Sequence, residues 1–177
     1  MQHRDIPDGQ RHEPKGISTA SAGQVYVANG NGSGAWIDKV AYGQLTTEDE
    51  DYVIATAGAF VDVNGLDEGL SKDVTLNGTD GTLVVVQGGV YNLSMNAVAS
   101  TNANQKRDIR FRFLVNNVAG TRTITTTSLE TNEKLHVGGK AFISLSAGDT
   151  LKIQVTTIGG TATVNLSGMD LSLQRIA

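Results

Sequence analysis

The sequence contains no cysteine among its 177 residues, which excludes disulfide bonds and thiolate metal ligands. Proline occurs only twice, and aromatic residues make up 5% of the chain, so the core is expected to be thin. No apolar run approaches the roughly 20 residues of a membrane-spanning helix, and Met1–Asp5 is not followed by the apolar segment of a secretory signal. We therefore expect no membrane insertion.

The chain also lacks an excess of basic residues and any cluster of histidines. Its formal net charge is −4, which disfavours nucleic-acid binding. The histidines His3, His12 and His136 lie far apart in the sequence, so a metal site within one chain is not expected. No Gly-x-Ser-x-Gly elbow accompanies a histidine, as a serine hydrolase would require. The sequence predicts no catalytic residues, no metal and no cofactor, although paired carboxylates of the glycosidase type are not readable from spacing.

Alternation of apolar and polar residues is what the chain does have. Tyr91, Leu93 and Met95 alternate with small polar residues, which is typical of a strand with one buried face. The same pattern recurs at intervals of about ten residues as far as the C-terminus, and no helical periodicity of useful length appears. The pattern therefore predicts an all-β fold class, either a sandwich or a jelly roll.

The first fifty residues are different, because they contain too few apolar residues for an independent core. Val25–Val27 is predicted as a short strand that turns at Asn29-Gly30 toward Ala35–Ile37. We therefore predict an extended N-terminal arm and linker at residues 1–50, with the acidic run 48–51 as a solvated hinge. The jelly-roll domain is then predicted at residues 51–177. Trp36 has two open interpretations, an anchor for a partner protein or a residue packed on its own hairpin.

The run His12-x-Pro14-Lys15-Gly16-Ile17, followed by Val25-Tyr26-Val27-Ala28-Asn29-Gly30 and Gly34-Ala35-Trp36, resembles the N-terminal attachment segment of tailed-bacteriophage fibre and head-decoration proteins. The resemblance covers about residues 6 to 37. It implies that this end holds the protein to the major capsid protein or another virion protein. The apolar residues expected to anchor it are Ile17, Val25, Tyr26, Val27 and Trp36.

A second resemblance covers about residues 83 to 177. Gly89-Val90-Tyr91-x-Leu93, Phe111-x-Phe113-Leu114-Val115-Asn116-Asn117, and Ile143-x-Leu145-x-Ala147-Gly148-Asp149-x-Leu151-x-Ile153 are similar to the jelly roll of tumour necrosis factor and of complement-type globular heads. Asn117 stands where glycine is commoner, so the type of that turn is left open. The resemblance implies a homotrimer.

Three apolar residues fall on the face opposite the main apolar row of their strands, namely Val98, Leu114 and Phe142. Such residues need cover, and we predict that they form the trimer interface, with cover by a loop of the same chain as the open alternative. His136 could also gather with its copies around a three-fold axis.

Polar loops supply the remaining candidates. Asn102, Asn104 and Arg107 are predicted as a possible loop for a host-surface glycan or a partner. Arg110 and Arg112 share a strand face, and we interpret them as ion-paired rather than as an anion site. The loop 77–81 has oxygen ligands, but we interpret it as a tight turn rather than a calcium loop.

The leading hypothesis is a homotrimeric bacteriophage structural protein, made in the host cytoplasm, that decorates the capsid surface as a short head fibre. The alternative is a glycan-binding module of a tail fibre. A glycan-cleaving enzyme is a third class, and it would require turnover.

Overall fold

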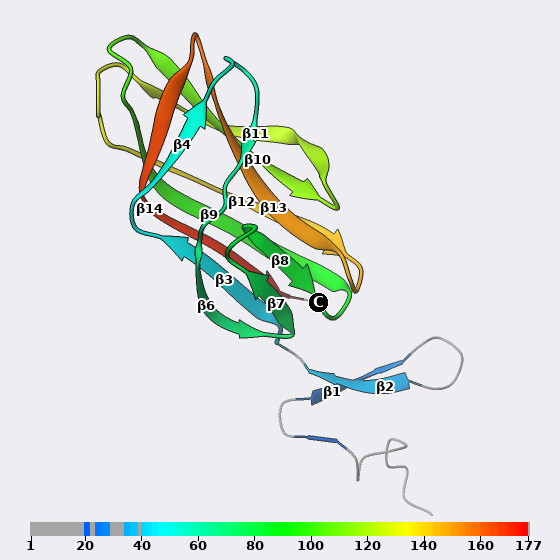
Figure 1. Cartoon of the computed structure of the whole chain (residues 1–177). Helices are drawn as coiled ribbons and strands as arrows, with labels where there is room; N and C mark the ends of the chain where they lie inside the picture. Colours follow the sequence, from blue (N-terminus) through cyan, green and yellow to red (C-terminus); the bar gives the residue numbers. More distant parts are fainter. Residues whose placement is uncertain (1–19, 22–23, 29–33, 39, 177) are drawn as a thin grey trace, which may run out of the picture. The chain divides into compact units, whose positions relative to one another are not determined.

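The computed structural model describes residues 20–21, 24–28, 34–38 and 40–176. The chain divides into two compact units, Met1–Lys39 and Val40–Ala177 (Figure 1). All regular structure in the described residues is β-strand. No described helix is therefore long and apolar enough to cross a membrane.

The first unit contains an antiparallel hairpin of β1 (Gln24–Ala28) and β2 (Gly34–Asp38). Its register pairs Tyr26 with Trp36, and the two rings meet edge to face with centroids 5.3 Å apart. The two predicted strands and their pairing are confirmed. The predicted turn at Asn29-Gly30 lies outside the described residues.

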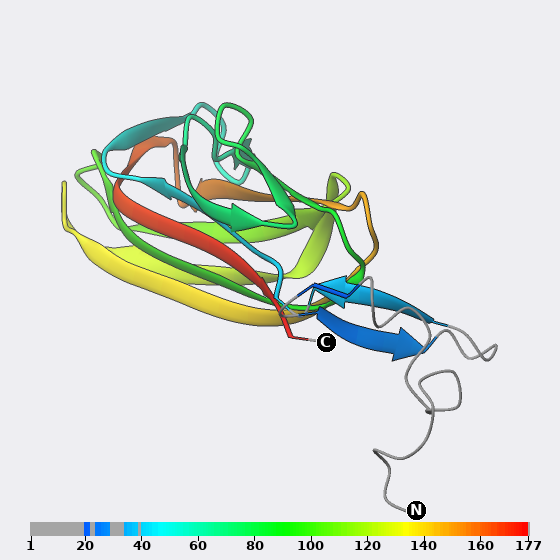
Figure 2. The ribbon, with the colours of Figure 1, turned by 90° about the horizontal axis from the view of Figure 1, so that it is seen from below.

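The second unit is a sandwich of two antiparallel sheets (Figure 2). We name the first one sheet I; it has the order β12-β9-β14-β3-β6, with β4 also paired to β14. Its strands are β12 (Leu135–Leu145), β9 (Gly89–Thr101), β14 (Ala162–Arg175), β3 (Tyr42–Thr47), β6 (Asp67–Lys72) and β4 (Glu50–Ile54).

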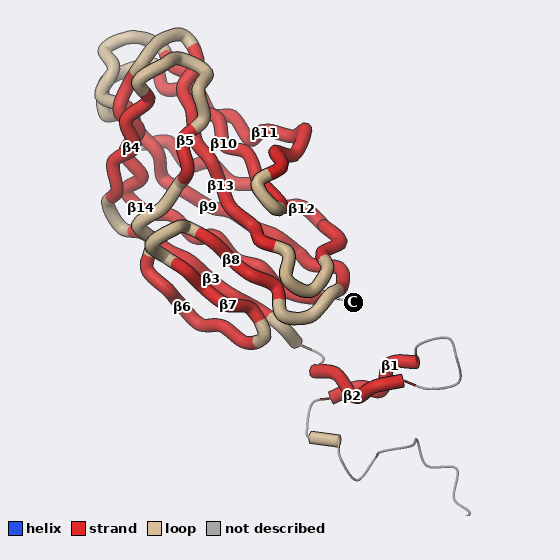
Figure 3. The backbone as a smooth tube through the Cα atoms, turned by 45° about the vertical axis from the view of Figure 1, so that its right-hand side comes forward, coloured by secondary structure: helices blue, strands red, loops and turns tan. Residues whose placement is uncertain are grey.

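We name the other one sheet II; it has the order β11-β10-β13-β8-β7, with β5 paired to β13. Its strands are β11 (Val118–Ser128), β10 (Arg107–Val115), β13 (Thr150–Ile158), β8 (Thr82–Val85), β7 (Val74–Asn77) and β5 (Val61–Asp62). Most neighbours within a sheet are not consecutive in the sequence, so the chain passes repeatedly from one sheet to the other, and the loops gather at the two ends (Figure 3). This is a jelly roll, as predicted.

The core lies between the two sheets and is built by the alternating apolar rows. Tyr91, Leu93 and Met95 from sheet I are fully buried, as are Phe111 and Ile153 from sheet II. Their polar neighbours in each strand point outward, because successive side chains of a strand lie on opposite faces. Periodicity alone therefore identified the inward face of these strands.

The sandwich begins earlier than predicted. β3 and β4 both pair with β14, so residues 40–50 belong to sheet I and are not a linker. Leu45 and Ile54 are almost fully buried, and Leu45 lies opposite Leu171. The acidic run 48–51 spans the turn between β3 and β4 and the start of β4. The sequence placed this boundary too late because β3 and β4 are short and carry few apolar residues.

The β10–β11 hairpin answers the question about Asn117. Val115 pairs with Val118, and the two residues between them, Asn116 and Asn117, have φ of 51° and 63°. Two consecutive residues in the left-handed region form a type I′ turn. Asparagine tolerates this conformation at both positions, and glycine is the commonest residue at the second position.

Candidate binding surfaces

The N-terminal hairpin has two different faces. Val25 and Val27 are 37% and 46% exposed on one face, and the Tyr26–Trp36 pair lies on the other. Trp36 therefore packs on its own hairpin, while its Nε1 has no hydrogen-bond partner. Ile17 lies outside the described residues.

The outer face of sheet I is poor in charge across β9, β12 and β14. The outward side chains of β9, β12 and β14 are mainly serine, threonine and asparagine, and only Lys140 and Asp170 carry a formal charge. Exposed large apolar residues collect on the same face of the sheet: Tyr42, Val53, Leu70, Val90 and Phe142. Low charge combined with exposed apolar side chains is typical of the core of a protein interface.

The outer face of sheet II is charged instead. Arg112 Nε donates to Gln154 Oε1 at 2.8 Å, and its guanidinium lies 3.8 Å from the centre of the Phe60 ring. Gln154 Nε2 and Lys152 Nζ both contact the Asp62 carboxylate, at 2.6 and 3.3 Å. This face is organised as a solvated polar network that holds β5 on the sheet.

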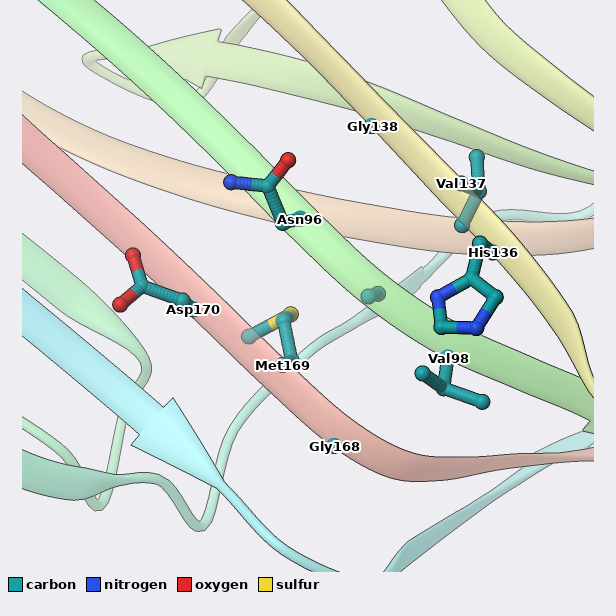
Figure 4. Close-up of a pocket in the computed structure, with 9 residues that line it drawn as sticks. Asn96, Val98, His136, Val137, Gly138, Gly168, Met169 and Asp170 are labelled. Atoms are coloured by element: carbon teal, nitrogen blue, oxygen red, sulfur yellow. The ribbon is translucent and has the colours of Figure 1, made fainter.

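A hollow of about 420 Å³ lies on the outer face of sheet I (Figure 4). Gly138 of β12 and Gly168 of β14 flank β9 on either side, opposite Asn96 and Val98. A Cβ at Gly138 would lie 2.7 Å from Asn96 Oδ1, so the Asn96 side chain occupies the space there. A Cβ at Gly168 would meet no atom within 4 Å. The remaining side chains at the hollow are His136, Val137, Met169 and Asp170.

No family model and no curated protein matches the sequence. Among solved structures, the sandwich is similar to Eiger TNF from S. frugiperda, with 13% identity over 78% of this chain and 92% of that one and a TM-score of 0.55. Murine APRIL aligns with 11% identity over 77% and 99% of the two chains, with a TM-score of 0.53. The globular domain of zebrafish complement 1qA aligns with 15% identity over 75% and 94%, with a TM-score of 0.50.

The sandwich has the TNF-like jelly-roll fold. Identities this low establish the fold alone. The vertex protein P5 of PRD1 also aligns, with 16% identity and a TM-score of 0.47, a similarity too low to support a conclusion.

The predicted trimer-interface residues do not share one surface of this TNF-like jelly roll. Val98 and Phe142 lie on the outer face of sheet I, and Phe142 is 75% exposed. Leu114 belongs to sheet II and is only 5% exposed, so its cover comes from its own chain. The register between β10 and β11 shifts between Arg112 and Leu114, which the sequence pattern did not reveal.

The predicted ligand loop is partly structural. Asn102 Oδ1 accepts from Thr163 N at 2.9 Å, which ties the end of β9 to the start of β14. Arg107 Nη1 donates to the neighbouring Lys106 carbonyl at 2.9 Å, and Asn104 is exposed. The three residues do not line a common hollow.

A second, polar hollow of about 380 Å³ does include Asn102. Sequence reasoning missed its other lining residues, because they converge from β4, β9, β14 and the segment before β12: Asp51, Ser100, Asn132, Lys134, Thr163 and Asn165. Asn165 Nδ2 donates to Asp49 Oδ1 at 2.7 Å and to Asp51 Oδ1 at 3.0 Å. Amides, a carboxylate and an ammonium group thus face one space.

The other polar candidates have local partners. Arg110 lies 3.6 Å from the Asp108 carboxylate, in agreement with the ion-pair interpretation. In the loop 77–81, Asp80 N donates to Asn77 Oδ1 at 3.1 Å and Asn77 Nδ2 donates to Asp80 Oδ2 at 2.8 Å, which is a tight turn. Within the described ranges, no group of three or more His, Asp or Glu residues is placed to hold a metal ion.

Within the described residues, three groups have shifted pKa values, each for a structural reason. Burial, reinforced by the charge of Glu50, raises the pKa of Tyr52 to about 12. Burial also raises the pKa of Tyr91, whose hydroxyl donates to the Gln87 carbonyl at 2.6 Å. Hydrogen bonds from the Asn116 side chain and the Ser146 backbone lower the pKa of Asp149.

Proposed function

We propose that this chain is a homotrimeric structural protein of a bacteriophage virion. In this proposal the N-terminal unit attaches to the capsid, and the TNF-like jelly roll forms a short head fibre that decorates it. The role is binding without turnover. The observation that carries the proposal is the division of the chain into a complete jelly roll and a separate hairpin with an apolar face.

The hairpin supports an attachment role because it is too small to be stable alone. An isolated two-stranded hairpin is at best marginally stable in water. Val25 and Val27 present partly exposed apolar surface, and Trp36 leaves an indole N–H without a partner. A partner protein that covers this face would gain affinity and would order the segment. The resemblance to phage attachment segments supports the major capsid protein or another virion protein as that partner.

Trimerisation would strengthen a weak attachment. Three anchors on one particle act together, because the first contact raises the effective concentration of the others. The homotrimer is supported by the charge-poor outer face of sheet I and by the resemblance to a homotrimeric family.

The proposal is tested by adding purified protein to virions that lack it and measuring co-sedimentation. Val25→Ser/Val27→Ser should weaken binding at least about tenfold, as expected when interface anchors are lost. Val118→Ser, at a 71% exposed site on the jelly roll, is the matched control and should bind normally. Hairpin variants that decorate particles as well as the wild type would exclude this attachment role.

A glycan-binding module of a tail fibre is the second candidate, and the polar hollow favours it. Amide and carboxylate groups such as Asn132, Asn165 and Asp51 can hydrogen-bond sugar hydroxyls. A glycan array probed with the wild type and with Asn132→Ala/Lys134→Ala separates the candidates. Binding that this variant loses would support the tail-fibre role, and release of reducing ends from a polysaccharide would show an enzyme instead.

A further inference from the structure

The outer face of sheet I carries a protruding side chain and an unfilled hollow at separate places. We propose that Phe142 of one copy of the chain seats in the hollow of the next copy, against Gly168 and Val98. In the same contact Lys140 of the first copy lies beside Asp170 of the second. This inference rests on the proposed homotrimer and names the residues that would form it.

The Phe142 side chain is exposed in a way that favours contact with another molecule. It is 75% exposed and lies on β12, a strand whose one partner among the described strands is β9, so that β12 forms an edge of the sheet. An exposed phenylalanine on the otherwise polar outward face of this strand costs solubility without any gain inside the chain. Its neighbour on the same face, Lys140, makes no ion pair within the described part of the chain.

The hollow has no explanation inside the chain either. Gly168 has no left-handed backbone conformation, and a Cβ there would meet nothing within 4 Å. The fold would accept a larger residue at this position. A glycine at a position where its neighbours leave room for a larger side chain is consistent with a side chain that arrives from another molecule.

Within one chain, the Phe142 side chain cannot reach the hollow beside Gly168. Phe142 lies opposite Asn92 of β9, whereas Gly168 lies opposite Val98 of the same strand. Six residues of strand correspond to roughly 20 Å. The contact must therefore join different copies. A head-to-tail contact of this kind forms a ring when the rotation between copies closes and a filament when it does not, and the homotrimer is the closed case.

Charge and spacing favour a second copy over a foreign partner. Lys140 and Phe142 stand two residues apart on β12, and Gly168 and Asp170 stand two residues apart on β14. An aromatic ring over Gly168 would place the lysine close to the aspartate when β12 of one copy runs along β14 of the next with Lys140 on the Asp170 side. The same chain supplies both halves of a complementary pair.

Cysteine crosslinking of the full chain tests this contact, because the protein contains no cysteine of its own. Under mild oxidation, Phe142→Cys/Gly168→Cys should form a covalent trimer on a non-reducing gel, whereas each single variant should not crosslink. Val118→Cys/Gly168→Cys is the matched control, since Val118 is equally exposed but lies on sheet II. Crosslinking by Phe142→Cys alone would show a symmetric two-fold contact and overturn the inference.

Light scattering of the wild-type protein separates the two levels of the proposal. A trimer that gives no 142–168 crosslink would refute this contact but leave the homotrimer intact, whereas a monomer would refute both.

Filling the hollow is an independent test that does not depend on disulfide geometry. Gly168→Leu should leave the thermal unfolding of the isolated chain unchanged and should weaken association at least about tenfold, as should Phe142→Ala. Because both substitutions remove one contact, the double variant should be no weaker than either single variant. Additive effects, or an unchanged association constant, would contradict the contact.

Discussion

The type I′ turn at Asn116-Asn117 offers a matched pair of substitutions. Both residues have positive φ, so replacing either one with glycine relieves a similar backbone strain of about 1 kcal/mol. Glycine costs about 0.5–1 kcal/mol in additional chain entropy, so the backbone effect nearly cancels at both positions. The two variants should then differ only through their side chains.

Asn116 is the one that makes tertiary hydrogen bonds. Its Oδ1 accepts from Thr150 N at 2.9 Å, and its Nδ2 donates to Asp149 Oδ1 at 2.8 Å. These bonds join the β10–β11 turn to the turn before β13. Losing the bond to Thr150 alone costs about 0.5–1 kcal/mol, and losing the bond to Asp149 adds to this in the same direction.

We therefore expect Asn117→Gly to be neutral or slightly stabilising, and Asn116→Gly to be less stable than Asn117→Gly by at least about 1 kcal/mol. In a domain of this size the difference corresponds to a midpoint about 4 °C lower in thermal unfolding. The variants must be compared at one protein concentration, because self-association shifts the midpoint.

The pH dependence of the stability difference between the two variants tests the bond from Asn116 to Asp149 directly. The lowered pKa of Asp149 means that its contribution is complete above the ordinary value of 3.8 and is lost as the pH falls through the lower folded value. The gap between the two variants should therefore shrink as the pH falls below 3.8. Equal midpoints for the two variants at neutral pH, or a gap that acid does not change, would refute the role assigned to Asn116.

Two further predictions concern the core. Gly139→Ala should destabilise the sandwich by about 1–3 kcal/mol in urea unfolding, because the added Cβ would lie 2.3 Å from Ile124 Cδ1. Adding Ile124→Val, which removes that methyl group, should recover much of the lost stability. If stability is not recovered, the strain lies elsewhere. Tyr52→Phe should cost about 1 kcal/mol at neutral pH, because the Tyr52 hydroxyl donates to the Asn64 carbonyl at 2.7 Å. Since the pKa of Tyr52 is raised from 10.0 to about 12, the wild type should lose stability across that pH range and Tyr52→Phe should lose less; identical alkaline profiles would count against this.

Local sequence patterns were enough to identify the strands with strong alternation. The rows through Tyr91 and Ile153 gave both the strand and its buried face, because side-chain direction along a strand has a period of two. The hairpin of β1 and β2 was also readable, since its strands are adjacent in sequence. Short strands such as β3 were not predicted from the sequence, because a few alternating residues do not distinguish a short buried strand from a linker.

The sequence by itself thus determined that the protein is a jelly roll with a separate N-terminal segment. Only the tertiary structure decided that Val98 and Phe142 share a surface, that Leu114 is covered within the chain, and that Gly138 and Gly168 flank one hollow. The physical reason is that a strand's period is a local property, whereas register and sheet order arise from pairing between distant segments. A bulge of one residue, such as the one between Leu166 and Gly168, redirects the side chains that follow it, so that the buried row moves from Val164 and Leu166 to Met169 and Leu171.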